Sequence, residues 1–338
     1  MKHLLEVENL STSFFTYAGE VKAVSNVSFY VDEGEAVGIV GESGSGKSVT
    51  VQSIMRLIPN PPGRITGGQI RFKGTDIVKA TEKMMLNIRG KQIGMIFQDP
   101  MTSLNPVLTI GKQLTEVLRQ HESMSENQAV QHAQKYLEMV GISNPEKRLK
   151  QYPHEFSGGM RQRVMIAMAL LCNPKLLIAD EPTTALDVTI QAQILELMKE
   201  LKETINTSII LITHDLGVVA GLCSRIMVMY GGKIVETGTV HEIYHTPKHP
   251  YTWGLLKSVP RLDAENKSKL IPIPGTPPDL IQPPKGCGFS ARCPYTMRIC
   301  NEQMPEVTVL SDKHQAACWL LHPNAPKIED FNLSVRGM

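Results

Sequence analysis

The chain has 338 residues, of which 42% are hydrophobic and 20% charged, and its formal net charge is +2. This composition predicts a globular protein of about two domains, and so small a charge gives no electrostatic reason to expect a nucleic-acid partner. The longest apolar runs are of strand length, short of the ~18–20 residues of a membrane span, and the N-terminus lacks the apolar core of a signal peptide. We therefore expect a cytosolic chain, with docking on a membrane protein left open.

The first third of the sequence alternates short strand-like runs with turns. Strands are expected at residues 23–31, 35–40 and 68–74. A glycine-rich loop follows the second of these runs, and residues 47–58 after it have helical spacing.

Between about Pro100 and Gln151 the pattern becomes helical. This stretch contains apolar residues at near-helical intervals, which we expect to form one face: Val130, Ala133, Leu137 and Val140. A loop then enters a further helix at residues 156–171. Residues 175–180 and 208–215 are nearly continuous in apolar residues, as buried strands of a parallel sheet are. This alternation predicts an α/β fold with helices on both faces of the sheet.

Residues 41–48 read GESGSGKS and match the phosphate-loop pattern G-x-x-x-x-G-K-[ST] without a mismatch, between a predicted strand and a predicted helix. The glycines allow the backbone to wrap around phosphate with its N–H groups directed inward. Lys47 is expected to reach the β- and γ-phosphates, and the Ser48 hydroxyl to hold Mg²⁺. The alternative, a glycine-rich turn before an ordinary helix, does not account for the agreement of sequence and context.

The run LLIADEP supplies an acidic pair directly after a predicted strand. Asp180 would lie near the magnesium ion, and Glu181 could orient or deprotonate an attacking water. An Asp-Glu pair after a strand is by itself more often a solvated turn. Its position after a phosphate loop favours the catalytic interpretation.

With these motifs in place, the sequence resembles the ABC ATPases. Residues 156–163 (FSGGMRQR) are similar to the signature sequence of that family, and the other family motifs appear in the expected order. Gln98 in IFQDP matches the Q-loop, Asp187 at the end of TALD matches the D-loop, and His214 in LITHD matches the switch histidine. Met160 stands where the signature commonly has glutamine, which we do not interpret as inactivation.

The resemblance implies the residues that bind ATP and Mg²⁺. The ATP set comprises Tyr17, Gly41, Ser43, Gly44, Ser45, Gly46, Lys47, Ser48 and Val49. Tyr17 is the aromatic expected to stack on adenine, although Phe14 and Phe15 lie close by in the sequence. The Mg²⁺ set comprises Ser48, Gln98 and Asp180, and the catalytic set comprises Glu181, His214 and Gln98.

In this family each nucleotide is sandwiched between two ATPase subunits. The resemblance therefore implies that Ser157, Gly158, Gly159 and Met160 contact the ATP that is bound by the partner's phosphate loop. It also implies a P-loop NTPase core with an antiparallel β subdomain and a helical subdomain at about residues 100–160. Gln98 would sense the γ-phosphate and pass its state to a transmembrane partner.

The C-terminal part resembles the extension of oligopeptide and dipeptide importer ATPases. The resemblance rests on an ordered series: the triplet His249-Pro250-Tyr251, the proline-rich run at residues 271–284, and the cysteine segment after it. Related importers with this extension take nickel or other small solutes, so both substrate classes stay open. The implied partners are a second ATPase subunit, favoured to be a paralogue, two transmembrane permease subunits and an extracytoplasmic solute-binding protein, at the cytoplasmic face of the membrane.

Four cysteines lie in the tail: Cys287, Cys293, Cys300 and Cys318. Their spacing lacks the close pairs of a structural zinc site. It suits a 4Fe–4S cluster better, because each iron takes one thiolate and the corners of a cluster lie farther apart than ligands on one ion. Zinc and the absence of any metal remain alternatives, whereas Cys172 and Cys223 are expected to be buried small hydrophobes. The resemblance also implies the cluster.

Three domains are predicted: an ATPase domain at residues 1–240, a bridging helix with a proline-rich linker at 241–285, and a small irregular metal-cluster module at 286–338. The predicted function is ATP hydrolysis that powers peptide import. One rival is a regulatory subunit that binds ATP but hydrolyses it poorly. Another is an ABC protein that acts on nucleic acid, which the short helical insert and the near-neutral charge disfavour.

Overall fold

The computed structural model describes residues 3–184, 186–258 and 272–328. The chain divides into two compact units, formed by Met1–Val31, Val37–Val78 and Thr213–Met338 and by Asp32–Ala36 and Lys79–Ile212. Residues 259–271 of the predicted bridging segment and residues 329–338 of the predicted cysteine module lie outside the described residues. The domain boundaries near residues 240 and 285 stay predictions.

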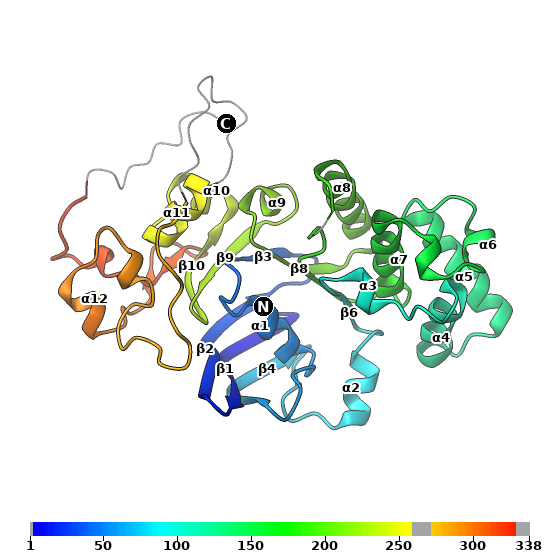
Figure 1. The fold of residues 1–338 in the computed structure, drawn as a ribbon, viewed down its shortest axis with the longest axis horizontal. Coiled ribbons are helices and arrows are strands. Elements are labelled where there is room, and N and C mark those ends of the chain that lie inside the picture. The colour runs from blue at the N-terminus through cyan, green and yellow to red at the C-terminus, as the bar shows by residue number, and fades with distance from the viewer. Residues whose placement is uncertain (1–2, 185, 259–271, 329–338) are drawn as a thin grey trace, which may run out of the picture. The chain divides into compact units, whose positions relative to one another are not determined.

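The first unit contains two sets of paired strands (Figure 1). One is a four-stranded antiparallel sheet in the order β2-β1-β4-β5, and the other joins β11-β12-β10-β9-β3, in which β3 runs parallel to β9. The strands are β1 (Leu5–Thr16), β2 (Gly19–Val31), β3 (Ala36–Val40), β4 (Gly63–Phe72), β5 (Thr75–Asp76), β9 (Arg225–Tyr230), β10 (Lys233–Thr239), β11 (Thr308–Val309) and β12 (Gln315–Ala316). The strands expected near residues 23, 35 and 68 are confirmed as β2, β3 and β4.

The helices of the first unit are short. They are α1 (Lys47–Ile54), α9 (Leu216–Ala220), α10 (Val240–His245), α11 (Pro250–Ser258) and α12 (Arg298–Glu302). The helix expected over residues 47–58 ends earlier, at Ile54. Arg56 adopts the left-handed conformation with φ 49°, and the Leu57 N–H donates to the Gln52 carbonyl at 2.8 Å, which closes the helix.

The second unit contains three parallel strands in the order β8-β7-β6. These are β6 (Ile93–Ile96), β7 (Leu176–Asp180) and β8 (Ser208–Thr213). Every residue of β7 and β8 is buried, as their continuous apolar sequences predicted. The helices are α2 (Glu82–Ile88), α3 (Pro100–Ser103), α4 (Ile110–Glu122), α5 (Glu126–Met139), α6 (Pro145–Arg148), α7 (Gly158–Leu170) and α8 (Val188–Ile205). The helical character expected between residues 100 and 151 is confirmed.

The buried face of α5 differs by one position from the expected face. Ala133, Leu137 and Val140 are fully buried, but Val130 is only half-buried and Ala129 takes its place in the core. Because a helix has 3.6 residues per turn, positions 129 and 130 both lie near the predicted stripe. Packing against the rest of the helical unit selects Ala129.

The proline-rich connector forms neither helix nor strand over residues 272–285, as predicted. It returns to the first unit, where the Lys22 N–H of β2 donates to the Leu280 carbonyl at 2.9 Å. Further along the chain, β12 pairs with β10, with Glu236 opposite Ala316. The C-terminal segment therefore packs along the same unit that carries α1 and β3.

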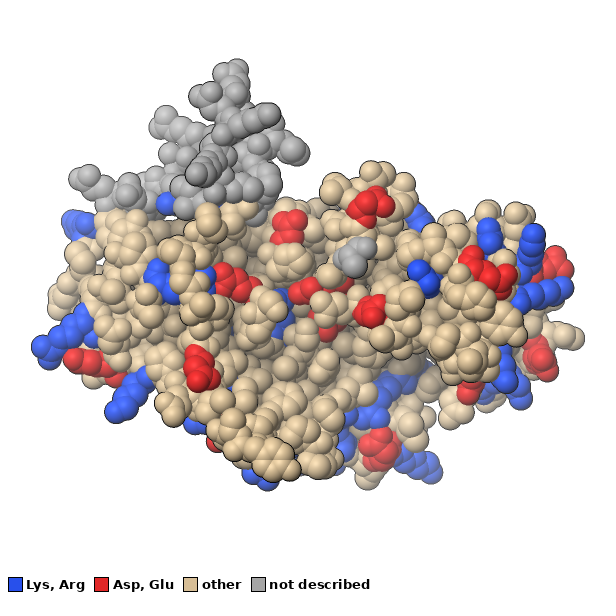
Figure 2. All heavy atoms as spheres, in the orientation of Figure 1, with Lys and Arg blue, Asp and Glu red and all other residues tan. Residues whose placement is uncertain are grey.

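No helix within the described ranges combines the length and the apolar character that crossing a bilayer requires. On the face drawn in Figure 2, basic and acidic side chains are interspersed.

We predict that two matched substitutions in the α5 region differ in cost. Val140→Ala removes two fully buried methyl groups and should lower the free energy of unfolding by about 1.5–3 kcal/mol. Val130→Ala removes the same atoms from a half-buried position and should cost less than about 1 kcal/mol. Urea unfolding followed by circular dichroism measures both values, and equal losses would contradict the assignment of the buried face.

Candidate functional site

The phosphate loop connects β3 to α1, and close approach of other backbone segments requires its glycines. A Cβ atom at Gly41 would lie 2.2 Å from the Met229 carbonyl oxygen. Gly46, at φ +102°, would place a Cβ atom 2.5 Å from the Ala23 carbonyl oxygen. The loop thus follows a path that only glycine permits at both ends, and its backbone N–H groups lead into the N-terminus of α1.

Lys47 is buried at the start of α1, and its ammonium group donates to the carbonyls of Gly41 at 2.8 Å and Glu42 at 3.0 Å. Ser48 and Val49 follow in the first turn of the helix. The other predicted ATP residues, Gly41, Ser43, Gly44, Ser45 and Gly46, form the continuous loop before it. This arrangement can bind a polyphosphate through backbone amides, a helix N-terminus and one lysine.

Two more predicted residues in the first unit are exposed. Tyr17 lies in the turn between β1 and β2 with its ring fully exposed, so a flat base can stack on it. His214 follows β8 and is also exposed. Next to it, Asp215 caps α9 by accepting the Gly217 N–H at 2.8 Å, which fixes the backbone around the histidine.

In the second unit, Asp180 ends β7 and is buried, and Glu181 follows it in the left-handed conformation with φ 46°. A non-glycine residue in this conformation costs about 1–3 kcal/mol, and such strain concentrates at functional sites. The Glu181 carboxylate accepts hydrogen bonds from the Gln98 amide and from the Thr184 hydroxyl, both at 3.0 Å. The structure therefore brings together two residues of the predicted catalytic set, Gln98 and Glu181.

The signature and D-loop residues also lie together in the second unit. The Ser157 hydroxyl caps α7 by accepting the Met160 N–H at 3.3 Å, so Gly158 and Gly159 form the half-buried first turn of that helix. A Cβ atom at Gly159 would lie 3.0 Å from the Ile190 side chain in the first turn of α8. Asp187 caps that helix by accepting the Ile190 N–H at 3.0 Å.

All six cysteines are free thiols. Cys223 is buried as predicted, whereas Cys172 is half-buried and burial raises its pKa to about 11. The four tail thiols lie close enough to influence one another electrostatically, and burial raises the pKa of Cys293 to about 11 and of Cys318 to about 12.

Each tail sulfur accepts a backbone N–H. The donors are Phe289 to Cys287, Tyr295 to Cys293, Met297 to Cys300 and Leu320 to Cys318. Hydrogen bonds of this type stabilise thiolates and tune cluster potentials. No group of three or more His, Cys, Asp or Glu side chains in the described parts of the chain could hold a metal ion. The structure gathers the thiols but does not establish a metal centre.

Sequence reasoning missed three residues that contact the site. Thr184 holds Glu181, and its position three residues further on could have suggested this. Glu42 occupies a variable position of the phosphate-loop pattern, and Arg292, in the cysteine segment, pairs with its carboxylate at 2.6 Å. No spacing rule connects residues so far apart in the sequence.

Comparison with solved structures identifies the fold as that of an ATP-binding cassette. The dimeric cassette MJ0796, in a post-hydrolysis state bound to ADP and Pi, matches with a TM-score of 0.63 and 28% identity over 70% of this chain and 98% of that chain. CbiO1 from Clostridium perfringens, part of an ABC transporter complex, matches with a TM-score of 0.62 and 26% identity over 72% of this chain and 91% of that chain. The ABC transporter family profile matches residues 24–184.

The relatives in sequence are more specific. The oligopeptide transport ATP-binding protein OppD of Bacillus subtilis is 63% identical over 96% of this chain and 91% of its own length. The dipeptide transport ATP-binding protein DppD of the same organism is 58% identical over 95% of each chain. The profile of the oligopeptide/dipeptide transporter C-terminal region matches residues 235–300. The chain therefore belongs to the family of ABC transporter ATPases that includes the oligopeptide and dipeptide transport ATP-binding proteins.

We predict that Lys47→Ala weakens equilibrium binding of Mg-ATP by about 10–100-fold, because a charged hydrogen bond to phosphate is worth about 1.5–3 kcal/mol. Titration of the purified chain with Mg-ATP measures the change. Lys83→Ala, at an exposed lysine of α2, is the matched control and should bind like the parent chain. Equal affinities for the two variants would show that this loop is not the nucleotide site.

Proposed function

We propose that this chain is the ATP-hydrolysing subunit of a peptide importer and works at the cytoplasmic face of the membrane. The proposal rests on one observation: the chain has both a phosphate loop whose path requires glycine, with the buried Lys47, and a glutamate in a strained conformation directly after β7. The relatives reported above are named for oligopeptide or dipeptide transport, which favours peptides over the alternative of nickel.

Each residue has a proposed role in hydrolysis. The phosphate loop and Lys47 bind the triphosphate, while Ser48 and Asp180 hold the Mg²⁺ ion that the family uses. Glu181 orients the attacking water and accepts its proton, with His214 stabilising the γ-phosphate as bond cleavage proceeds. The N-terminus of α7, with Ser157, Gly158, Gly159 and Met160, would contact the ATP that is bound by the phosphate loop of a partner ATPase subunit.

The contact between Gln98 and Glu181 supports a coupling mechanism. The Gln98 amide donates to the Glu181 carboxylate at 3.0 Å, so a displacement of the segment that carries Gln98 alters the orientation of the proposed catalytic base. A transmembrane partner that moves this segment would thereby control hydrolysis, and the γ-phosphate would signal in the opposite direction. The proposed partners are a paralogous ATPase subunit, two permease subunits and a solute-binding protein.

We predict that Glu181→Gln reduces single-turnover hydrolysis in the assembled complex by about 100-fold or more, because the amide cannot accept the proton from water. ATP binding should persist, since the side chain keeps its size and its neighbours. Glu203→Gln, at an exposed carboxylate of α8, serves as the matched control. An unchanged rate for Glu181→Gln would favour the rival interpretation, a regulatory subunit that hydrolyses ATP poorly.

We further propose that Cys287, Cys293, Cys300 and Cys318 hold a 4Fe–4S cluster. The four thiols lie close enough to influence one another electrostatically, and each accepts a backbone N–H of the kind that stabilises cluster thiolates. Because burial raises the pKa of Cys287, Cys293 and Cys318, the bound metal would have to drive their deprotonation. A bound cluster would stabilise the fold of this small segment directly, because the segment has little apolar core of its own. Zinc and an empty thiol site are the competing outcomes.

We predict that the protein, purified without oxygen, contains about four iron and four sulfide per chain and has a brown chromophore. Cys318→Ser should reduce the iron and sulfide content, whereas Cys223→Ser, at a buried cysteine outside the tail, should leave both unchanged. A colourless protein with one zinc per chain, or with no metal, would rule out the cluster.

A further inference from the structure

The second residue of the phosphate loop, Glu42, is held from outside the loop. Its carboxylate forms a bidentate pair with Arg292, with Nη1–Oε2 and Nη2–Oε1 distances of 2.6 and 3.0 Å. The Arg292 side chain is only 5% exposed and that of Glu42 is 29% exposed. A bidentate guanidinium–carboxylate pair fixes orientation as well as distance, so Arg292 determines where the Glu42 side chain lies.

The backbone of Glu42 is held as well. Its N–H donates to the hydroxyl of Tyr251 at 2.8 Å. Tyr251 is fully buried and packs against Tyr230 and Phe289, with ring centroids 4.5 and 5.4 Å away. Burial raises the pKa of Tyr251, so the hydroxyl stays protonated and available as an acceptor for the amide. The His-Pro-Tyr triplet thus contacts the phosphate loop directly.

Arg292 joins the loop to two other segments. Its Nε donates to the Pro274 carbonyl at 2.8 Å and Nη2 to the Ile273 carbonyl at 3.0 Å, both in the proline-rich connector. Nη1 also donates to the Tyr230 hydroxyl at the end of β9, at 3.2 Å. With its donors distributed in this way, Arg292 has no freedom to follow Glu42, and the loop must adapt to it.

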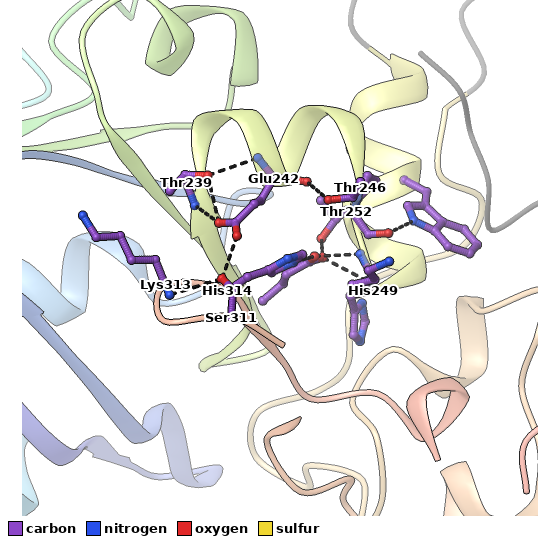
Figure 3. Close-up of polar contacts among 12 residues, drawn as sticks. Thr239, Glu242, Thr246, His249, Thr252, Ser311, Lys313 and His314 are labelled. Carbon is purple, nitrogen blue, oxygen red and sulfur yellow. Dashed lines mark hydrogen bonds and ion pairs between the residues drawn. The ribbon is translucent and has the colours of Figure 1, made fainter. Parts of the chain in front are cut away.

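The segment that supplies Tyr251 has a rigid support of its own on β10 (Figure 3). The buried carboxylate of Glu236 accepts the backbone N–H groups of Lys248 and His249 at 2.7 and 2.9 Å and the Thr252 hydroxyl at 2.6 Å. Its fourth donor is His314 Nε2 at 2.9 Å, which connects the chain between Cys300 and Cys318 to β10. A buried carboxylate with four donors holds its partners in one geometry.

Glu42 is also in direct contact with Lys47, the lysine expected to bind phosphate. The Glu42 carbonyl oxygen accepts from Lys47 Nζ at 3.0 Å, so any shift of the Glu42 backbone changes the position from which that ammonium group meets phosphate. If the Arg292–Glu42 pair were purely structural, its loss would lower only the stability of the fold. Because Glu42 also contacts Lys47 through its carbonyl, loss of the pair should in addition change the affinity for the nucleotide.

We propose that Arg292 and Tyr251 are positioning residues for ATP: through Glu42, the C-terminal extension sets the geometry of the phosphate loop. The inference deepens the proposed function, since it assumes that this loop binds ATP. It makes the extension part of the nucleotide site and gives the segment between Cys287 and Cys293 a direct path to that site.

The test compares Arg292→Gln, Glu42→Gln and the double variant in the assembled transporter. Each single change should raise the KM for ATP and the dissociation constant of Mg-ATP by about fivefold to twentyfold, with kcat at saturating ATP nearly unchanged. The double variant should bind Mg-ATP no more weakly than the single variant with the lower affinity, because both substitutions remove the same interaction. Arg298→Gln, at an exposed arginine that forms a surface ion pair with Glu302, is the matched control.

Tyr251→Phe keeps the ring and removes only the hydroxyl, so it probes the second contact if Arg292→Gln fails to fold. It should also raise the KM for ATP and leave kcat nearly unchanged. A variant that loses thermal stability but keeps the parent KM would overturn the inference, as would fully additive effects of Arg292→Gln and Glu42→Gln. Absence of hydrolysis in the unmodified complex would instead contradict the proposed function itself.

Discussion

A phosphate loop must present bare backbone N–H groups to an anion, and its glycines have no side chains that could hold it in shape. Contacts from outside the loop therefore have to fix its path. Here the carbonyl oxygens of Met229 and Ala23 lie where Cβ atoms of Gly41 and Gly46 would be, and the Gly232 N–H donates to the Ser45 carbonyl at 2.9 Å. Strands β2 and β9 and the turn after β9 therefore restrict the path of the loop.

The second unit fixes the position of a carboxylate. Glu181 stands in a strained backbone conformation and accepts hydrogen bonds from Gln98 and Thr184. Two donors on one carboxylate restrict its orientation. The same unit contains the N-terminus of α7, which the Ser157 hydroxyl caps by accepting the Met160 N–H.

The C-terminal extension connects these requirements to the cysteine segment. Its small size leaves little apolar core, so it relies on polar contacts, among them those with the carboxylates of Glu236 and Glu42. Glu236 accepts four hydrogen bonds and Glu42 accepts two from Arg292. These contacts fix the position of the extension on the first unit. An extension held in this way is suited to influence the phosphate loop, and a metal centre in the cysteine segment would reinforce the geometry.

The local chemistry could be predicted from the sequence because it depends on residue types at fixed spacing along one segment. The phosphate loop and the acidic pair after β7 are of this kind, and the strands before them were expected where they are found. The end of α1 and the buried face of α5 were less well predicted, since Arg56 leaves the helical conformation and packing selects Ala129 over Val130.

Only the tertiary structure decided that Glu42 meets Arg292, 250 residues further along the chain, and that Tyr251 accepts its N–H. Pairings of this kind arise when separate segments pack on one strand layer, and neither composition nor periodicity encodes which surface positions will coincide. The sequence by itself determined the local patterns, the phosphate-loop glycines with Lys47 and the acidic pair after β7, because these depend on residue types at fixed spacing. The packing of the chain determined which of the other residues hold them in place.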